Sequence, residues 1–210
     1  MTGRAAPFPA DPAPFWDKRF AESGFAYGDQ PNDFLREQAA QLPVGRALCL
    51  AEGEGRNAVH LAQLGHAVLA QDISPVGLAK ARALADSRHV AIETLCCDLA
   101  DYEPPQAAFD LVMAIWMHLP PPLRAETHRR AVAALRPGGQ LILEGYTPRQ
   151  LAFGTGGPPS EALLIEPEVL RRELAGLELL VLQERERWIE EGPYHRGRSA
   201  VVQTLGRKAG

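Results

Sequence analysis

The stretch LCLAEGEGRNAVHLAQLG, residues 48–65, has the pattern of a strand, a turn and a helix. An apolar run leads into a glycine-spaced turn, and the turn leads into an amphipathic segment that ends at Gly65. Gly53, Gly55 and Ala58 satisfy the G-x-G-x-x-G/A spacing of a nucleotide-binding strand–turn–helix unit. Two carboxylates, Glu52 and Glu54, lie within this turn. The stretch therefore predicts a ligand loop between a strand and a helix, and the ligand must tolerate negative charge.

The same alternation continues along the chain. Further strands are predicted over 67–71, 90–95, 109–115 and 140–144, after a first strand over 46–51. Helices are predicted over 16–20, 33–42, 57–64 and 123–135, with another that Ser74 caps and Pro75 begins. Continuous apolar strands alternating with helices are typical of a parallel sheet covered on both faces. The predicted fold is a doubly wound α/β domain.

The C-terminal part has a different pattern. Residues 177–188 and 199–205 are strand-like, and the ten residues between them are too few for a parallel crossover. They predict an antiparallel hairpin at the sheet edge, where the alternating charges of residues 184–187 would oppose further pairing. We expect one domain over 1–210, with a loose tail (1–14), an N-terminal helical cap (15–45) and a lid (146–166) after the fifth strand.

Composition narrows the function classes. The chain has 210 residues, and its 22 basic and 26 acidic side chains give a net charge of −4. No basic cluster suits nucleic acid, and the longest uncharged apolar run, 111–117, is too short for a bilayer. The prolines of the first 14 residues argue against a signal peptide, and the three cysteines show no metal spacing. We expect a cytoplasmic protein without a metal, a monomer or weak homodimer, acting on a small molecule.

The acidic turn indicates which ligand is bound. The pyrophosphate of a dinucleotide would lie over this loop, where Glu52 and Glu54 would repel it. A ligand with an ammonium and a sulfonium group, such as S-adenosylmethionine, would be attracted. Asp72 at the end of the second strand could accept hydrogen bonds from ribose hydroxyls, and Asp98 after the third from the adenine amino group. An NAD enzyme would carry the same Asp72, so an NAD(P)-dependent oxidoreductase stays an alternative.

Several motifs, in order, resemble a known family. LCLAEGEGRN, DIS, CCDLADY and LRPGGQLILEGY are similar to successive motifs of class I S-adenosylmethionine-dependent methyltransferases. FWDKRF, YGDQPNDFL, GTGGP and EGPYHRG resemble the small bacterial methyltransferases of the tellurite-resistance type. The resemblance implies a Rossmann-like sheet of seven strands with the last one antiparallel. It also implies S-adenosyl-L-methionine as cofactor and S-adenosyl-L-homocysteine as product.

The resemblance implies cofactor contacts at matching positions. The methionine moiety would be held by Glu52, Gly53, Gly55 and Asn57, and the ribose by Asp72. The adenine would be framed by Ile73, Asp98 and Leu99. The floor near the sulfonium would be lined by Ile115 and Trp116, and Tyr27 would close over the cofactor, although it could instead pack an N-terminal helix.

The acceptor side rests on the hairpin loop. If residues 177–188 run parallel to the first strand, the loop lies on the cofactor side of the sheet. His195 could then act as a base or orienting donor, and Arg196 and Arg198 could hold an oxyanion or thiolate. The loop could equally be a solvated turn, and His118 is the rival residue. We expect a methyltransferase acting on a small nucleophile, for which a chalcogen oxyanion or a thiol would fit. O- or N-methylation of a metabolite and a non-catalytic cofactor-binding module are the alternatives.

Overall fold

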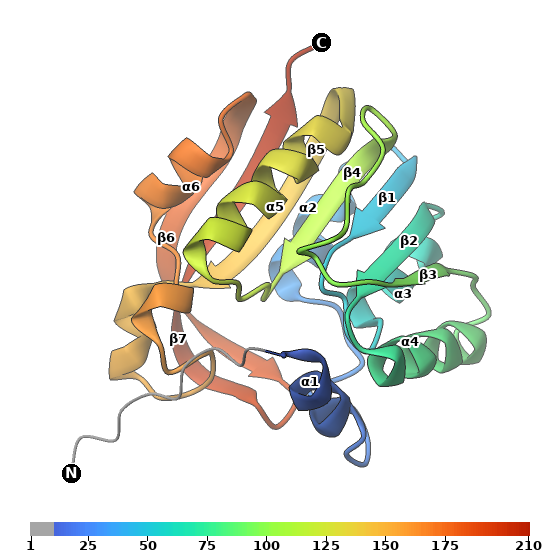
Figure 1. The fold of residues 1–210 in the computed structure, drawn as a ribbon, viewed down its shortest axis with the longest axis vertical. Helices are drawn as coiled ribbons and strands as arrows, with labels where there is room; N and C mark the ends of the chain where they lie inside the picture. The colour runs from blue at the N-terminus through green and yellow to red at the C-terminus, as the bar shows by residue number, and fades with distance from the viewer. Residues whose placement is uncertain (1–10) are drawn as a thin grey trace.

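The computed structural model describes residues 11–210, and most of the tail expected over 1–14 lies outside this range. It contains a single seven-stranded sheet with the order β3-β2-β1-β4-β5-β7-β6 (Figure 1). The strands are β1 (Arg46–Cys49), β2 (Ala67–Asp72), β3 (Glu93–Cys96), β4 (Phe109–Ile115), β5 (Leu135–Tyr146), β6 (Leu177–Glu191) and β7 (His195–Lys208). The first five pair in parallel, and β7 is antiparallel to both of its neighbours. The predicted doubly wound sheet with an antiparallel closing hairpin is confirmed.

Helices cover both faces of the sheet (Figure 1). They are α1 (Ala13–Phe20), α2 (Asp33–Ala39), α3 (Arg56–Gln63), α4 (Pro75–Ser87), α5 (Pro121–Ala134) and α6 (Pro167–Glu173), with 3-10 turns η1 (Pro148–Ala152) and η2 (Glu161–Leu163). Alternate residues of each strand point to opposite faces. Leu48 and Val112 therefore pack toward α5 and α6, whereas Cys49 and Met113 pack toward α2, α3 and α4. The helix α6 was not predicted from the sequence.

The closing hairpin is longer than the sequence suggested. β6 and β7 pair from Leu177 opposite Lys208 to Glu191 opposite His195, which leaves residues 192–194 as the tip. β5 pairs with β7 only as far as Tyr146 opposite Val201. The arms beyond that point therefore project past the carboxyl end of β5, toward α1 (Figure 1). This places His195 in a strand rather than in a loop.

The glycine turn after β1 is shaped by helix packing. Gly55 has φ 89°, and a Cβ there would lie 2.5 Å from the Cβ of Ala81 in α4. Gly138 also has positive φ, 79°, but no described heavy atom lies within 4 Å of its Cβ position. A side chain at Gly138 would therefore introduce backbone strain alone, whereas a side chain at Gly55 would introduce both backbone strain and steric overlap.

We expect Gly55→Ala to lower the free energy of unfolding by about 2–5 kcal/mol, because overlap adds to strain. Gly138→Ala should cost only the strain, about 1–2 kcal/mol. Urea unfolding of both variants measures the difference. Equal losses would show that α3 and α4 do not need their close approach at Gly55.

Candidate active site

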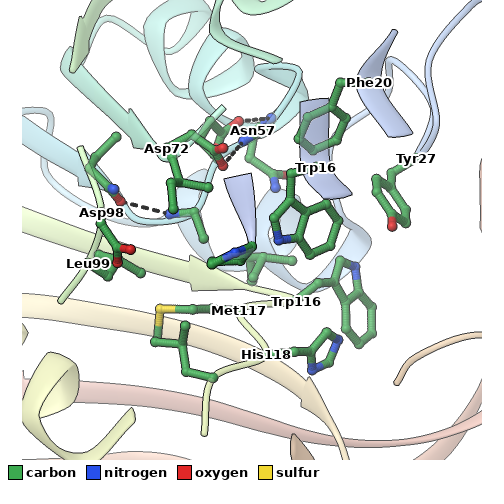
Figure 2. A pocket seen from close by; sticks show the side chains of 18 of the residues that line it. Trp16, Phe20, Tyr27, Asn57, Asp72, Asp98, Leu99, Trp116, Met117 and His118 are labelled. Atoms are coloured by element: carbon green, nitrogen blue, oxygen red, sulfur yellow. Dashed lines mark hydrogen bonds between the residues drawn. The ribbon is translucent and has the colours of Figure 1, made fainter. Parts of the chain in front are cut away.

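A cavity of about 470 Å³ opens at the carboxyl ends of the parallel strands. This is the edge of a doubly wound sheet where ligands bind. All the predicted cofactor residues except Gly55 are among the described residues that line it, together with His118 and His195. Figure 2 shows Asp72 and Asp98 at one side of the cavity, and Tyr27, Trp116 and His118 at the other. The cavity thus has an acidic end and an aromatic end.

Glu52 is the central carboxylate of the acidic end. Its Oε1 accepts hydrogen bonds from the backbone N–H groups of Asn57 (3.0 Å) and Ala58 (2.8 Å), at the start of α3. Its Oε2 is buried and has no hydrogen-bond partner among residues 11–210. Burial raises the pKa of Glu52 to about 7. An unsatisfied buried carboxylate oxygen that faces a cavity indicates a missing donor.

Glu54 corrects the interpretation that both turn carboxylates face the ligand. Its Oε2 accepts a hydrogen bond from the backbone N–H of Ala26 (2.7 Å), and its Oε1 lies 2.9 Å from the Lys80 ammonium. It is 4% exposed and is not one of the described cavity residues. Glu54 therefore ties the N-terminal segment to α4, and only Glu52 gives the loop its charge toward the ligand.

Two further acids stand where the next two strands end. Asp72 accepts hydrogen bonds from the backbone N–H groups of Gly53 and Ser74, both at 2.8 Å. Burial raises the pKa of Asp72 to about 6. Asp98 is half-buried, and its Oδ1 accepts from the backbone N–H of Ala100 at 2.8 Å. Each carboxylate thus shapes its own turn and still borders the cavity.

The aromatic end is built around Trp116. Its ring stacks on Tyr146 with centroids 4.4 Å apart, and His195 packs against it at 5.0 Å. Tyr27 lies 4.6 Å from the His195 ring. Within the described chain, the buried Nδ1 of His195 and both ring nitrogens of His118 have no hydrogen-bond partner of normal geometry. Burial lowers the pKa of His195 to about 3 and that of His118 to about 4. Both imidazoles are therefore neutral near pH 7.

The hairpin arginines lie elsewhere. Arg196 pairs with Glu190 at 3.4 Å, and Arg198 pairs with Glu186, both at the exposed surface. Neither is among the described residues of the cavity. The reason is the period of two in a strand: His195 points inward, so Arg196 and Arg198 cannot follow it. The structure brings His195 to the cavity without the two arginines.

The N-terminal segment contributes residues that sequence reasoning missed. Trp16 and Phe20 of α1 line the cavity beside Tyr27. Their i, i+4 spacing predicts one helix face, although nothing in it says where that helix docks. The hairpin tip fixes α1, because the Tyr194 hydroxyl donates to the Glu22 carboxylate (2.6 Å). Arg19 also lies over the Tyr194 ring at 3.6 Å.

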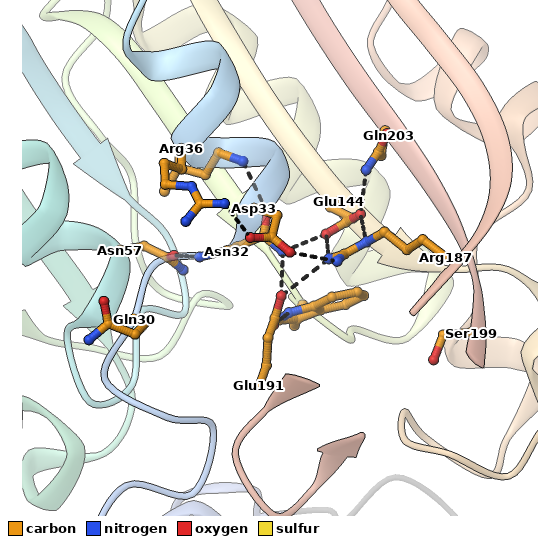
Figure 3. A network of polar contacts seen from close by, with 12 residues as sticks. Gln30, Asn32, Asp33, Arg36, Asn57, Glu144, Arg187, Glu191, Ser199 and Gln203 are labelled. Carbon is orange, nitrogen blue, oxygen red and sulfur yellow. Dashed lines mark hydrogen bonds and ion pairs between the residues drawn. The ribbon is translucent and has the colours of Figure 1, made fainter. Parts of the chain in front are cut away.

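A buried polar network supports the aromatic end from behind (Figure 3). Glu191 accepts hydrogen bonds from the Trp116 indole (2.6 Å), the Arg56 guanidinium (2.6 Å) and the Asn32 amide (2.9 Å). The Asn32 amide also donates to Glu144, which Arg187 and Gln203 approach from the hairpin. Trp116 has a left-handed φ of 57°, a conformation that needs such support.

The segment expected to be a lid packs behind this end. The Gln150 side chain donates to Thr155 (3.0 Å) and accepts from the Ala200 backbone N–H (2.9 Å). A Cβ at Gly156 would lie 2.8 Å from the Tyr146 hydroxyl and 3.1 Å from His195. None of residues 147–166 is among the described lining residues. In this structure the segment is a back wall for Tyr146 and His195.

Residues 11–210 contain no helix that is long and apolar enough to cross a membrane. Over the same range, no group of three or more His, Cys, Asp or Glu side chains is placed to hold a metal ion.

Comparisons with known proteins identify the domain. Residues 47–139 match the family model described as a methyltransferase domain. The matched segment, which runs from β1 into β5, identifies residues 47–139 as a methyltransferase domain. No curated protein matches the chain in sequence.

Solved structures show the same fold at low identity. One, described as "Conversion of a Disulfide Bond into a Thioacetal Group during Echinomycin Biosynthesis", has a TM-score of 0.77 and 20% identity, covering 95% of this chain and 92% of that chain. TehB from Haemophilus influenzae has a TM-score of 0.70 and 17% identity, covering 93% and 66%. Magnesium protoporphyrin IX methyltransferase from Synechocystis PCC 6803, solved with bound S-adenosylhomocysteine, has a TM-score of 0.64 and 17% identity, covering 83% and 81%.

Proposed function

We propose that the acidic end of the cavity binds the adenosine and amino-acid parts of the cofactor, and that a small nucleophilic acceptor enters the aromatic end. The observation that carries the proposal is the buried, unpartnered Oε2 of Glu52 among residues 11–210. An ammonium group is the donor that this oxygen lacks. S-adenosylmethionine carries one, and the residues around it fit the rest of that molecule.

Each cofactor contact has a structural basis. Glu52 accepts from the ammonium, Gly53 leaves room at the turn, and Asn57 stands at the start of α3. Asp72 accepts from the ribose hydroxyls, while Asp98 accepts from the adenine amino group between Ile73 and Leu99. Ile115, Trp116 and Tyr27 surround the sulfonium, where aromatic faces stabilise a cation. Gly55 supports the site through the packing of α3 on α4 instead.

The bound cofactor supplies an activated methyl group with a good leaving group. The protein has to align the acceptor and exclude water. Trp116, His118 and His195 form walls that can do both, and the unpartnered imidazole nitrogens can accept a hydrogen bond or a proton from the acceptor. A chalcogen nucleophile, either an oxyanion or a thiol, suits a small site whose walls are polarisable aromatic and imidazole rings. The conversion of a disulfide bond into a thioacetal group, named for one solved relative, favours the same class.

A substitution at Asp98 tests the cofactor site. Asp98→Ala should weaken S-adenosylhomocysteine binding by about 1.5–3 kcal/mol, the worth of a hydrogen bond to a charged group. Asp101→Ala is the matched control, because Asp101 is exposed in the same turn. Calorimetric titration of both variants gives the comparison. If Asp98→Ala binds S-adenosylhomocysteine with the parental affinity, Asp98 does not contact the adenine.

The raised pKa of Glu52 predicts a pH dependence of binding. In the free protein Glu52 is protonated below about pH 7, whereas an ammonium needs the ionised carboxylate. Affinity should therefore rise with pH, and S-adenosylhomocysteine should bind about tenfold more weakly at pH 6 than at pH 8. Titrations at pH 6, 7 and 8 measure this. Glu52→Gln should bind weakly with a smaller pH slope, since Asp72 still titrates. A wild-type affinity that is constant over this range would contradict the role of Glu52.

The cytoplasmic location and the monomeric or weakly dimeric state stay predictions from the sequence.

A further inference from the structure

The charge of the aromatic end restricts what can bind there. Arg56 is the one Lys or Arg among the described residues that line the cavity. Its guanidinium is 6% exposed and is paired with Glu191 at 2.6 Å, and it also donates to the Gln30 carbonyl. Arg19, which donates to the Tyr27 hydroxyl (3.2 Å), pairs with Glu22 at 4.0 Å, and the surface arginines of the hairpin pair with Glu186 and Glu190. The aromatic end thus offers an acceptor no uncompensated protein cation within residues 11–210.

The two imidazoles do not supply one either. His195 is 4% exposed and is enclosed by the rings of Tyr27, Trp116 and Tyr146, at centroid distances of 4.6, 5.0 and 5.2 Å. The groups that face it also include His118, Glu191, Arg56 and Arg19, of which Glu191 is neutralised by Arg56 and Arg187. The ring of His118 stacks on Tyr146 at 5.8 Å, and both its nitrogens are buried. Imidazoles in such surroundings stay neutral and polar.

A charged acceptor would lose hydration here without gaining a protein group of opposite charge. Burying an unpaired ion costs several kcal/mol even after relaxation, whereas burying a neutral group with a hydrogen-bond partner costs little. An oxyanion enters as an anion, and an aliphatic amine, with a pKa near 10, enters as a cation at pH 7. A thiol, with a pKa near 8.5, enters mainly uncharged. Its S–H group is a weak hydrogen-bond donor for an imidazole nitrogen, and the thiolate that forms when the proton leaves is a strong nucleophile.

We infer that the aromatic end, formed by Tyr27, Trp116, Met117, His118 and His195, is a binding site for a small uncharged thiol, which is S-methylated there. The inference rests on the proposed function and narrows it, because it excludes the chalcogen oxyanions. The thiol sulfur forms a bond to the methyl carbon while the bond from that carbon to the cofactor sulfur breaks, and its electron pair stays on the cofactor sulfur. The thiol proton passes to the His195 imidazole and then to solvent.

A panel of matched acceptors tests the inference on the wild-type chain. The probes are 3-mercaptopropionamide, its charged analogue 3-mercaptopropionate, ethanolamine, selenite and tellurite, each assayed at pH 7.5 by formation of S-adenosylhomocysteine. We expect kcat/KM for the amide to exceed that for the carboxylate by about tenfold or more, and the other three to stay at background. Preference for the carboxylate, or turnover of either oxyanion at the rate of the amide, would overturn the inference.

Two further measurements locate the site and separate the two proposals. His118→Ala enlarges the aromatic end, so it should raise kcat/KM for phenylmethanethiol relative to 3-mercaptopropionamide by about tenfold, a change that a purely structural role would not produce. If this ratio of kcat/KM values is unchanged in His118→Ala, the thiol does not bind at the aromatic end. S-adenosylhomocysteine binding is measured beside each assay. Tight binding with no thiol turnover overturns the thiol site alone, whereas absence of binding overturns the proposed cofactor site.

Discussion

Replacement of His195 by alanine is expected to lower kcat by about 10²–10⁴, the usual contribution of a positioned acid or base. Its Nδ1 is buried without a partner in the described chain, beside Trp116 at the aromatic end. The affinity for S-adenosylhomocysteine should change little, because the acids that we propose to hold the adenosine, Asp72 and Asp98, stand at or just after the ends of other strands. Steady-state kinetics with a working acceptor, together with calorimetric titration, separate the two effects.

Arg196→Ala is the control for this substitution. Arg196 is the next residue of β7, but its side chain is exposed and pairs with Glu190. Arg196→Ala should change kcat by less than about twofold, because the side chain lies outside the cavity. The fold should also be preserved, since surface substitutions of this kind shift stability by only about 0.5 kcal/mol. If His195→Ala keeps the parental turnover, His195 is not the base, and His118 becomes the residue to test in that role.

Glu191→Ala should lower the free energy of unfolding by about 3–5 kcal/mol. It would leave the buried Arg56 guanidinium unpaired and would take an acceptor from Trp116 and Asn32. Glu190→Ala is the matched control, since Glu190 is the neighbouring residue and is exposed. Urea unfolding measures both. Losses of similar size in the two variants would contradict a supporting role for the network.

The same carboxylate predicts how stability depends on pH. Burial alone would raise the pKa of Glu191, but Arg56 and Arg187 beside it lower the pKa to about 2. A folded-state pKa below the unfolded value means that the stabilisation is present above about pH 4.5 and is lost as the pH falls toward 2. Glu191→Gln should therefore lose part of the acid-induced destabilisation of the parent.

The sheet and most of its cavity residues were accessible from the sequence because both depend on local patterns. The apolar runs predicted the strands, and an acid at a strand end must border the ligand edge of a parallel sheet, as Asp72 and Asp98 do. The hairpin followed from the short gap between its two runs. These inferences need only the order and length of the elements.

What could not be predicted depends on register and on distant contacts. The sequence does not show how far β6 and β7 pair, so it does not show that His195 points inward and Arg198 outward. It does not distinguish Glu52, which faces the cavity, from Glu54, which binds Ala26 and Lys80. Glu191 and Asn32 are 159 positions apart, and no local pattern connects them.

The cofactor preference of the acidic turn is tested most directly by ligand-induced stabilisation of the wild-type chain. S-adenosylhomocysteine at about 100 times its dissociation constant should raise the free energy of unfolding by about 2.7 kcal/mol, and NAD at the same concentration should have no comparable effect. Calorimetric titration supplies both affinities. Tight binding of NAD with no response to S-adenosylhomocysteine would contradict the assignment of Glu52, Asp72 and Asp98 to an S-adenosylmethionine site.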